Sequence, residues 1–122
     1  MAKKILLIED DIFLSSLLGN RLKREGFDLF SVKNGNEAVK IAKAEKPDLV
    51  LLDIILPGKS GFEVLEEMRM DSEVAKAPVI IISNLGQDTD IERGRESGVV
   101  DYIVKAKVTI DDLVDWVKSF LK

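Results

Sequence analysis

Acidic, hydroxyl and lysine side chains in this sequence each follow a short apolar run, where folding could bring them together. They are Glu9, Asp10, Asp11, Asp53, Ser83 and Lys105. The carboxylates offer hard oxygen ligands without nitrogen or sulfur, and such a set favours Mg²⁺, with Mn²⁺ as the alternative. The lysine adds a positive charge and the serine a hydrogen-bond donor. These residue types suit the binding and transfer of an anionic group.

Asp53 is the candidate nucleophile of this set. Several carboxylates within a few ångströms repel one another unless a cation neutralises them, so we expect Asp10 and Asp53 to share a bound Mg²⁺. One oxygen of Asp53 would stay free, and a carboxylate nucleophile can accept a phosphoryl group as an acyl phosphate. Lys105 and the metal would balance the charge of the transferring group, and Ser83 would donate a hydrogen bond to the phosphate.

The composition excludes several other chemistries. The 122 residues contain no cysteine and no histidine, which rules out disulfides, zinc–thiolate sites, imidazole bases and serine–histidine triads. The net charge of −4 argues against nucleic-acid binding by this domain. No apolar run approaches the length of a membrane span, and acids follow the basic start too soon for a signal peptide. We therefore expect a cytoplasmic protein that does not bind membranes.

Five short apolar runs, bounded by turn residues or acids, are typical of buried parallel strands. The runs are 3–8, 27–32, 48–53, 78–83 and 101–104. Segments with helical spacing follow them, and three of these segments open with the spacing of a helix cap: Asn34 with Glu37, Ser60 with Glu63, and Thr109 with Asp112. The fourth helix, roughly Thr89 to Ser97, contains Gly94, which costs about 1 kcal/mol relative to alanine. We expect this helix to be the least stable one.

Strict alternation predicts an α/β fold with a single doubly wound sheet of five parallel strands, in the flavodoxin-like order 2-1-3-4-5, and helices on both faces. Residues 1–122 would form one domain, without an output domain. All carboxyl ends of a parallel sheet lie at one edge, and neighbouring strands are about 5 Å apart. That edge would place the acids 9–11 on one side of Asp53 and Ser83 on the other, with Lys105 reaching in from beyond Ser83.

With these residues in place, the sequence resembles a response-regulator receiver domain of two-component signalling, similar to chemotaxis regulators, over essentially its whole length. The matching segments are Ile8–Asp11, Leu51–Gly58, Ile81–Asn84 and Asp101–Lys105. The resemblance implies that Asp53 takes a phosphoryl group from a sensor histidine kinase or a histidine phosphotransfer protein. It also implies self-catalysed, Mg²⁺-dependent phosphorylation and dephosphorylation, a downstream protein partner, and a monomer or weak phosphorylation-dependent dimer.

The resemblance assigns further roles around the metal and the phosphate. Asp10 would bind Mg²⁺ directly, Glu9 would bind it through water, and Ile55 would offer its backbone carbonyl. Ser83 and Tyr102 would form the switch pair that couples phosphorylation to the output face.

Three departures from the family pattern concern this site. Ala106 follows Lys105 where the family usually has proline in a cis peptide; because a non-proline cis bond costs about 3 kcal/mol, we expect a trans bond. Asn84 stands where a small residue is usual, and it would either hinder the switch or cap the loop. Ile55 and Leu85 are apolar where they should flank the phosphate, and we hypothesise that they hinder water and prolong the acyl phosphate.

Simpler interpretations apply to some of these residues. Asp11 is better explained as a helix-capping acid than as a ligand. Phe13 and Trp116 are apolar but lie off the inward stripes of their helices, and Ile12 precedes Phe13. They are either flanking residues half covered by neighbours or a partner surface, with Ile12 and Phe13 facing the kinase and Trp116 facing the output partner.

The alternative function is a phosphorylation-independent docking module with a receiver fold. The acidic pair, Asp53 and Lys105 count against it. A dehalogenase-type hydrolase would need a second aspartate at the position of Ile55, a flavodoxin would need a phosphate loop that is not acidic, and a P-loop motif is absent.

Overall fold

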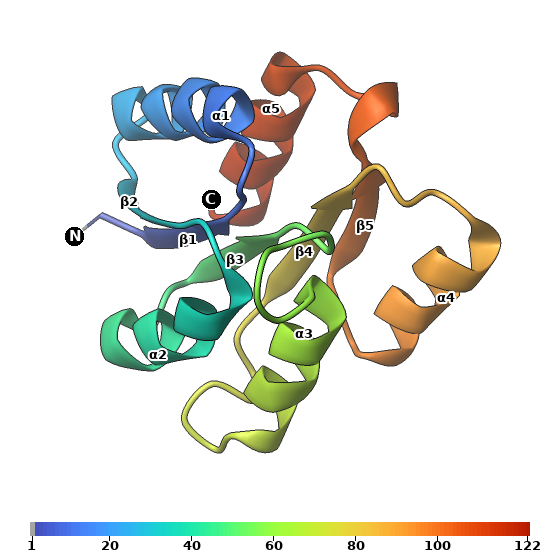
Figure 1. Cartoon of the computed structure of the whole chain (residues 1–122). Helices are drawn as coiled ribbons and strands as arrows, with labels where there is room; N and C mark the ends of the chain where they lie inside the picture. Colours follow the sequence, from blue (N-terminus) through green and yellow to red (C-terminus); the bar gives the residue numbers. More distant parts are fainter. Residues whose placement is uncertain (1) are drawn as a thin grey trace.

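Strands and helices alternate along the chain in this computed structural model, which describes residues 2–122 (Figure 1). The strands are β1 (Lys4–Ile8), β2 (Asp28–Val32), β3 (Leu49–Leu52), β4 (Val79–Ser83) and β5 (Asp101–Val104). The helices are α1 (Ile12–Arg24), α2 (Gly35–Glu45), α3 (Gly61–Met70), α4 (Asp88–Glu96) and α5 (Ile110–Phe120), and a 3₁₀ turn covers Lys105–Lys107. The strands and α4 begin and end within one residue of the predicted bounds. Among residues 2–122, no helix combines the length and the apolarity that crossing a bilayer requires.

The five strands form one parallel sheet in the order β2-β1-β3-β4-β5, which confirms the predicted topology. Ile8 at the end of β1 pairs with Leu52 at the end of β3, and Leu52 pairs in turn with Ile81 of β4. The backbone amide of Asp53 donates a hydrogen bond to the carbonyl oxygen of Ile8, at 2.9 Å. This register places the residue after β3 beside the residues after β1.

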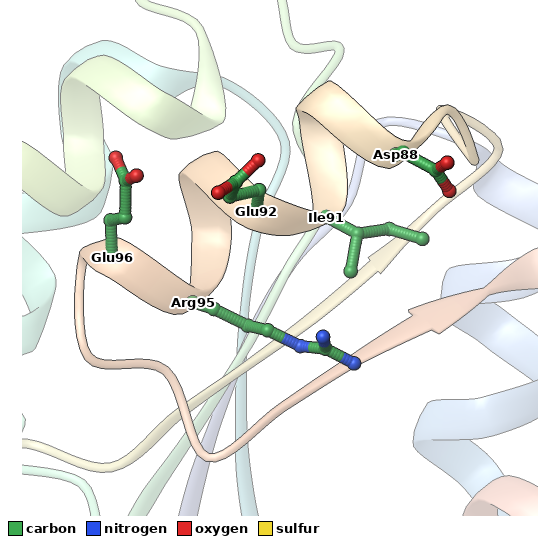
Figure 2. Close-up of a pocket in the computed structure, with 5 residues that line it drawn as sticks. All are labelled: Asp88, Ile91, Glu92, Arg95 and Glu96. Atoms are coloured by element: carbon green, nitrogen blue, oxygen red, sulfur yellow. The ribbon is translucent and has the colours of Figure 1, made fainter.

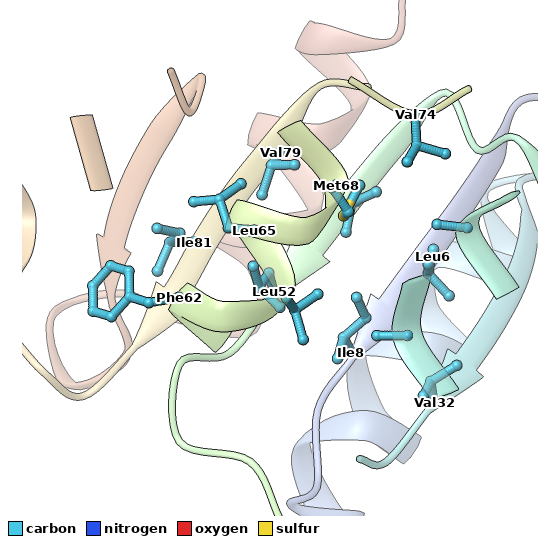
Figure 3. Close-up of a cluster of buried hydrophobic side chains, with 14 of the residues drawn as sticks. Leu6, Ile8, Val32, Leu52, Phe62, Leu65, Met68, Val74, Val79 and Ile81 are labelled. Atoms are coloured by element: carbon cyan, nitrogen blue, oxygen red, sulfur yellow. The ribbon is translucent and has the colours of Figure 1, made fainter. Parts of the chain in front are cut away.

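Helices cover both faces of the sheet (Figure 1). Residues alternate along β1: Leu6 and Ile8 belong to the core cluster under α2 and α3, which Figure 3 shows, whereas Ile5 and Leu7 belong to the cluster under α1 and α5. A strand that is buried on both faces must be apolar at every position, and this is why β1, β3 and β4 are continuous apolar runs in the sequence.

Side-chain hydrogen bonds at the helix starts confirm most of the predicted helix caps. Two capping boxes are present, Ser60 with Glu63 at α3 and Thr109 with Asp112 at α5. At α2, the Asn34 side chain accepts a hydrogen bond from the Glu37 amide at 3.0 Å. The Glu37 carboxylate reaches back to the Asn34 side-chain amide at 3.3 Å and not to its backbone, so α2 has a cap without the reciprocal backbone bond.

Helix α4 is attached to the domain differently from the other helices. Gln87 precedes it without a capping hydrogen bond from its side chain, and Gly94 is its only buried residue. A β-carbon built on Gly94 would lie 2.9 Å from both the Ile81 and the Tyr102 side chains, so the helix backbone rests directly on the sheet. That α4 is the least stable helix stays a prediction.

Candidate functional site

The carboxyl edge of the sheet gathers the predicted site residues around one open pocket of about 210 Å³. The residues that line it are Glu9, Asp10, Asp11, Asp53, Ile55, Ser83, Asn84 and Lys105. They come from the segments that follow β1, β3, β4 and β5, four separate parts of the sequence. The acids, the hydroxyl and the lysine therefore converge where the strand order predicts.

Asp53 is buried among the pocket residues, with 6% of its surface exposed. Its Oδ1 accepts hydrogen bonds from the backbone amides of Ile54 at 2.7 Å and Ile55 at 3.4 Å. Its Oδ2 accepts one from the Lys105 ammonium at 2.9 Å. A buried carboxylate is costly unless it is paired and hydrogen-bonded, and these donors provide the compensation.

Lys105 bridges two carboxylates in this pocket. Its Nζ lies 2.6 Å from Glu9 Oε1 and 2.9 Å from Asp53 Oδ2. Burial alone would lower the pKa of Lys105, but its hydrogen bonds to Glu9 and Asp53 outweigh this effect and raise the pKa. Burial raises the pKa of Glu9 to about 7, against the opposing hydrogen bonds from Lys105 and from the Asp11 amide. The ammonium therefore stays charged at neutral pH between the two acids.

Glu9, Asp10 and Asp53 form a group that could hold a metal ion. Each offers one carboxylate oxygen, and these oxygens lie within 4.8 Å of one another. The donor set consists of hard oxygens only, and this chemistry fits a divalent cation such as Mg²⁺ or Mn²⁺. Asp10 is exposed whereas the other two acids are buried, so Asp10 is the acid that solvent reaches most easily. Ile55, the predicted carbonyl ligand, lines the same pocket.

The two predicted switch residues meet at the backbone of Leu85. Ser83 is completely buried at the end of β4, and its Oγ accepts a hydrogen bond from the Leu85 amide at 3.2 Å. Tyr102 is half-buried in β5, and its hydroxyl donates a hydrogen bond to the Leu85 carbonyl oxygen. Burial, together with the nearby charge of Asp90, raises the pKa of Tyr102. Serine and tyrosine are thus linked through one loop residue.

The Lys105 contacts differ from the arrangement expected from the sequence. The prediction has Lys105 facing an incoming phosphate, but its ammonium already pairs with Glu9 and Asp53. The pair with Glu9 was not predicted, because spacing along the chain does not reveal which acid a long lysine side chain reaches. The peptide bond between Lys105 and Ala106 is trans, as expected. Asp11 caps α1 by accepting a hydrogen bond from the amide of the third helical residue, which confirms its simpler interpretation.

The proposed partner residues differ in their exposure. Ile12 and Phe13 on α1 are 65% and 83% exposed. Trp116 on α5 is half-buried, its ring nitrogen donates a hydrogen bond to Asp101 Oδ2 at 3.2 Å, and its ring stacks on Phe120 with 5.3 Å between centroids. This placement matches the interpretation of Trp116 as a flanking residue, and a role of the three residues in partner binding stays a prediction.

A larger depression of about 600 Å³ lies along α4 (Figure 2). Its lining residues all belong to that helix: Asp88, Ile91, Glu92, Arg95 and Glu96. Glu92 and Glu96 point to one side of the helix, and Ile91 and Arg95 point to the other (Figure 2). It shares no residue with the pocket around Asp53, so size alone does not identify the site.

The sheet order and the acidic edge together define a receiver domain. A sequence model of the family described as the response regulator receiver domain matches residues 5–118. The chain belongs to this family, the receiver domains of two-component response regulators.

Solved structures of such domains are similar to this chain over nearly their whole length. One is the BeF3-activated N-terminal receiver domain of RstA from Klebsiella pneumoniae, with 31% identity, a TM-score of 0.87, and coverage of 98% of this chain and 99% of that chain. The Mn²⁺-bound form of the response regulator Rcp1 has 28% identity, a TM-score of 0.82, and coverage of 98% and 94%. The phosphorylated cyanobacterial phytochrome response regulator RcpA has 30% identity, a TM-score of 0.82, and coverage of 98% and 91%.

Proposed function

We propose that this receiver domain is a signalling switch in which Asp53 accepts a phosphoryl group from a sensor histidine kinase or a histidine phosphotransfer protein. The observation that carries the proposal is the buried Asp53 carboxylate, 2.9 Å from the Lys105 ammonium and beside two further acids in an open pocket. Burying such a charged group adds little to stability compared with an apolar residue. A chemical role explains its presence better than a structural one.

The proposed transfer uses groups that are already in the pocket. An Asp53 carboxylate oxygen forms a bond to the phosphorus of a phosphohistidine, the P–N bond breaks, and the imidazole that leaves takes up a proton. Charge in such a transfer spreads over the equatorial phosphoryl oxygens. The Lys105 ammonium lies beside the attacking carboxylate and can pair with the phosphoryl oxygens as their negative charge develops. Ser83 donates its hydroxyl hydrogen to a phosphate oxygen. Water later hydrolyses the acyl phosphate and resets the switch.

Asp10 and Asp53 are the residues that we expect to hold Mg²⁺, with Glu9 contributing through a water molecule and Ile55 through its backbone carbonyl. When bound there, the ion supplies positive charge to the phosphoryl oxygens. Mn²⁺ accepts the same oxygen ligands, and the relative Rcp1 has been solved with Mn²⁺ bound.

The output would pass from Ser83 to Tyr102. If Ser83 turns toward the phosphate, the Leu85 amide loses its acceptor, and the loop that Tyr102 holds by its hydroxyl must rearrange. This would change the surface of α4, β5 and α5, where a downstream protein binds. In this role the domain works in the cytoplasm without nucleic-acid or membrane contacts of its own, as a monomer or a weak phosphorylation-dependent dimer.

Ile12 and Phe13 would contact the phosphoryl donor, because α1 begins directly after the acids that line the pocket. Exposed apolar side chains beside a reaction site suit a protein partner. Phe13→Ser should slow transfer from the cognate phosphohistidine protein and leave transfer from a small phosphodonor unchanged. Equal slowing with both donors, or no slowing with either, would contradict this docking role.

Intact mass spectrometry tests the proposed function directly. With a small-molecule phosphodonor and Mg²⁺, the parent chain should gain one phosphoryl group, whereas Asp53→Asn should gain none and a chelator should abolish the gain. A parent chain that stays unmodified would favour the phosphorylation-independent docking module. A modified Asp53→Asn variant would place the acceptor at another residue.

A further inference from the structure

Glu9 makes the shorter of the two ion pairs of Lys105. Its Oε1 lies 2.6 Å from the ammonium nitrogen, compared with 2.9 Å for Asp53 Oδ2. The pair is sheltered from solvent, since the Lys105 side chain is 17% exposed and that of Glu9 only 3%. Screening by water is therefore weak, and the attraction at this distance is strong.

The second oxygen of Glu9 fixes the direction of its carboxylate. Oε2 accepts a hydrogen bond from the backbone amide of Asp11 at 3.1 Å. Glu9 also continues directly from β1, and its own amide donates a hydrogen bond to the carbonyl oxygen of Val32 in β2 at 2.9 Å. Backbone hydrogen bonds thus hold both the amide and the carboxylate of Glu9, and the oxygen that contacts Lys105, Oε1, has a defined position.

Lys105 itself has no comparable support from its own segment. It opens the 3₁₀ turn Lys105–Lys107, and none of the three residues of that turn is buried. A lysine side chain has four flexible carbons, and its ammonium is a point charge without preferred geometry. The position of the Lys105 ammonium therefore depends on the acids that it contacts.

We infer that Glu9 is a positioning residue that holds the Lys105 ammonium beside Asp53 before and during phosphoryl transfer. Asp53 cannot do this alone, because its carboxylate becomes an acyl phosphate in the reaction. The Glu9 carboxylate takes no part in the bond that forms, so its contact with Lys105 can persist while Lys105 exchanges the Asp53 oxygen for a phosphoryl oxygen in the same pocket. The kinetic consequence rests on the proposed function, whereas the contact between Glu9 and Lys105 does not.

The contact can be tested without any phosphoryl donor. In nitrogen-15-labelled, metal-free protein, the side-chain ammonium signal of Lys105 is assigned by its loss in Lys105→Gln. Glu9→Gln should shift this signal and speed its hydrogen exchange with water. Asp10→Asn is the matched control, because it removes a neighbouring acid that forms no ion pair with Lys105 in the described structure, and it should leave the signal in place. An unchanged signal in Glu9→Gln overturns the inference.

A second substitution covers the case in which Glu9→Gln does not fold. Glu9→Asp keeps the negative charge and is shorter by one methylene, so it should release Lys105 and move the same signal in the same direction. A parental Lys105 signal in Glu9→Asp would overturn the inference, because the reach of Glu9 would then not determine where the ammonium lies.

The kinetic test separates positioning from metal binding. With a small phosphodonor and Mg²⁺ at a concentration that saturates the parent chain, Glu9→Gln should slow phosphorylation of Asp53 by about ten- to a hundredfold. This is the usual cost of a misplaced catalytic group. Asp10→Asn should mainly raise the Mg²⁺ concentration needed for half-maximal rate. If more Mg²⁺ restores the Glu9→Gln rate, Glu9 acts through the metal and the inference fails. A parent chain that is not phosphorylated contradicts the proposed function but leaves the result on the Lys105 signal intact.

Discussion

The hydroxyl of Tyr102 donates a hydrogen bond to the backbone carbonyl oxygen of Leu85, which connects strand β5 to the loop that follows β4. The amide of the same Leu85 donates to the buried hydroxyl of Ser83. Tyr102 and Ser83 are therefore joined through one peptide segment. This arrangement gives the proposed switch a physical connection that can be measured at the tyrosine.

Tyr102 should ionise at a higher pH in the folded chain than in the unfolded chain. Burial and the charge of Asp90 raise its pKa above the ordinary value of 10. Because the pKa is higher in the folded chain, the Tyr102 hydroxyl of the unfolded chain loses its proton first as the pH rises. Below pH 10 this group therefore leaves the free energy of unfolding unchanged, and between pH 10 and the folded pKa it lowers that free energy. Tyr102 is the only tyrosine, so tyrosinate absorbance reports on it alone.

Asp90→Asn supplies the control for this titration. Removing the nearby negative charge should lower the pKa of Tyr102, while burial continues to hold it above the pKa of the unfolded chain. Identical titration curves for native and denaturant-unfolded protein would contradict the buried position of the ring.

Gly94→Ala should displace the Tyr102 ring or lift α4. The added β-carbon would lie 2.9 Å from a Tyr102 ring carbon and 2.9 Å from an Ile81 methyl carbon, so one of them must move. Alanine improves helix propensity by about 1 kcal/mol, and the close contacts should cancel some or all of this gain in the free energy of unfolding. The pKa of Tyr102 should move toward 10 as the ring becomes more exposed.

Glu92→Gly calibrates the helix propensity on the exposed side of α4, where it should cost about 1 kcal/mol. If Gly94→Ala instead gains that full amount and leaves the Tyr102 titration unchanged, the contact of α4 with the ring is looser than the described geometry.

The edge of the sheet was predictable because it depends on simple patterns. Continuous apolar runs identified β1, β3 and β4, and parallel pairing then required the residues after them to meet at one edge. The position of Asp53 beside Ser83 follows from this topology alone. Strand ends are short-range features, so each was within one residue of its predicted place.

The contacts inside the site were less predictable, because they depend on side-chain reach and on backbone atoms of loops. Lys105 could pair with several acids, and only the three-dimensional structure selects Glu9. The Leu85 hydrogen bonds use main-chain atoms that every residue except proline would offer. From the sequence, Gly94 predicts only a less stable helix. The structure explains why a glycine stands there, because a β-carbon at this position would lie too close to Tyr102.

Arg69→Ala should be one of the more destabilising substitutions outside the pocket. The guanidinium of Arg69 joins the end of α3 to two loops by donating hydrogen bonds of 2.9 to 3.3 Å to the carbonyl oxygens of Ala75, Ala77, Ser97 and Gly98. Hydrogen bonds from a charged group are worth more than neutral ones, so we expect a loss of about 2–4 kcal/mol in the free energy of unfolding. Denaturant titration measures this loss.

Arg95→Ala is the matched control for that substitution, since Arg95 lies exposed on α4. It should change the free energy of unfolding by about 0.5 kcal/mol or less. Arg69→Lys should recover only part of the stability, because one ammonium cannot reproduce the planar donor geometry of the guanidinium. Equal effects of the two alanine substitutions would refute the bridging role of Arg69.

Ile55→Asn should shorten the lifetime of the acyl phosphate on Asp53, provided that the proposed phosphorylation occurs. Ile55 lines the pocket and is 59% exposed, so its apolar side chain occupies the solvent side of the site without offering a hydrogen bond to water. An asparagine amide of similar size could orient a water molecule toward phosphorus, and such orientation should speed hydrolysis by about tenfold. Intact mass followed over time, after removal of the phosphodonor, measures the decay. Ile55→Leu keeps the apolar surface and should decay like the parent. If Ile55→Asn and Ile55→Leu decay at the parental rate, Ile55 does not control the access of water.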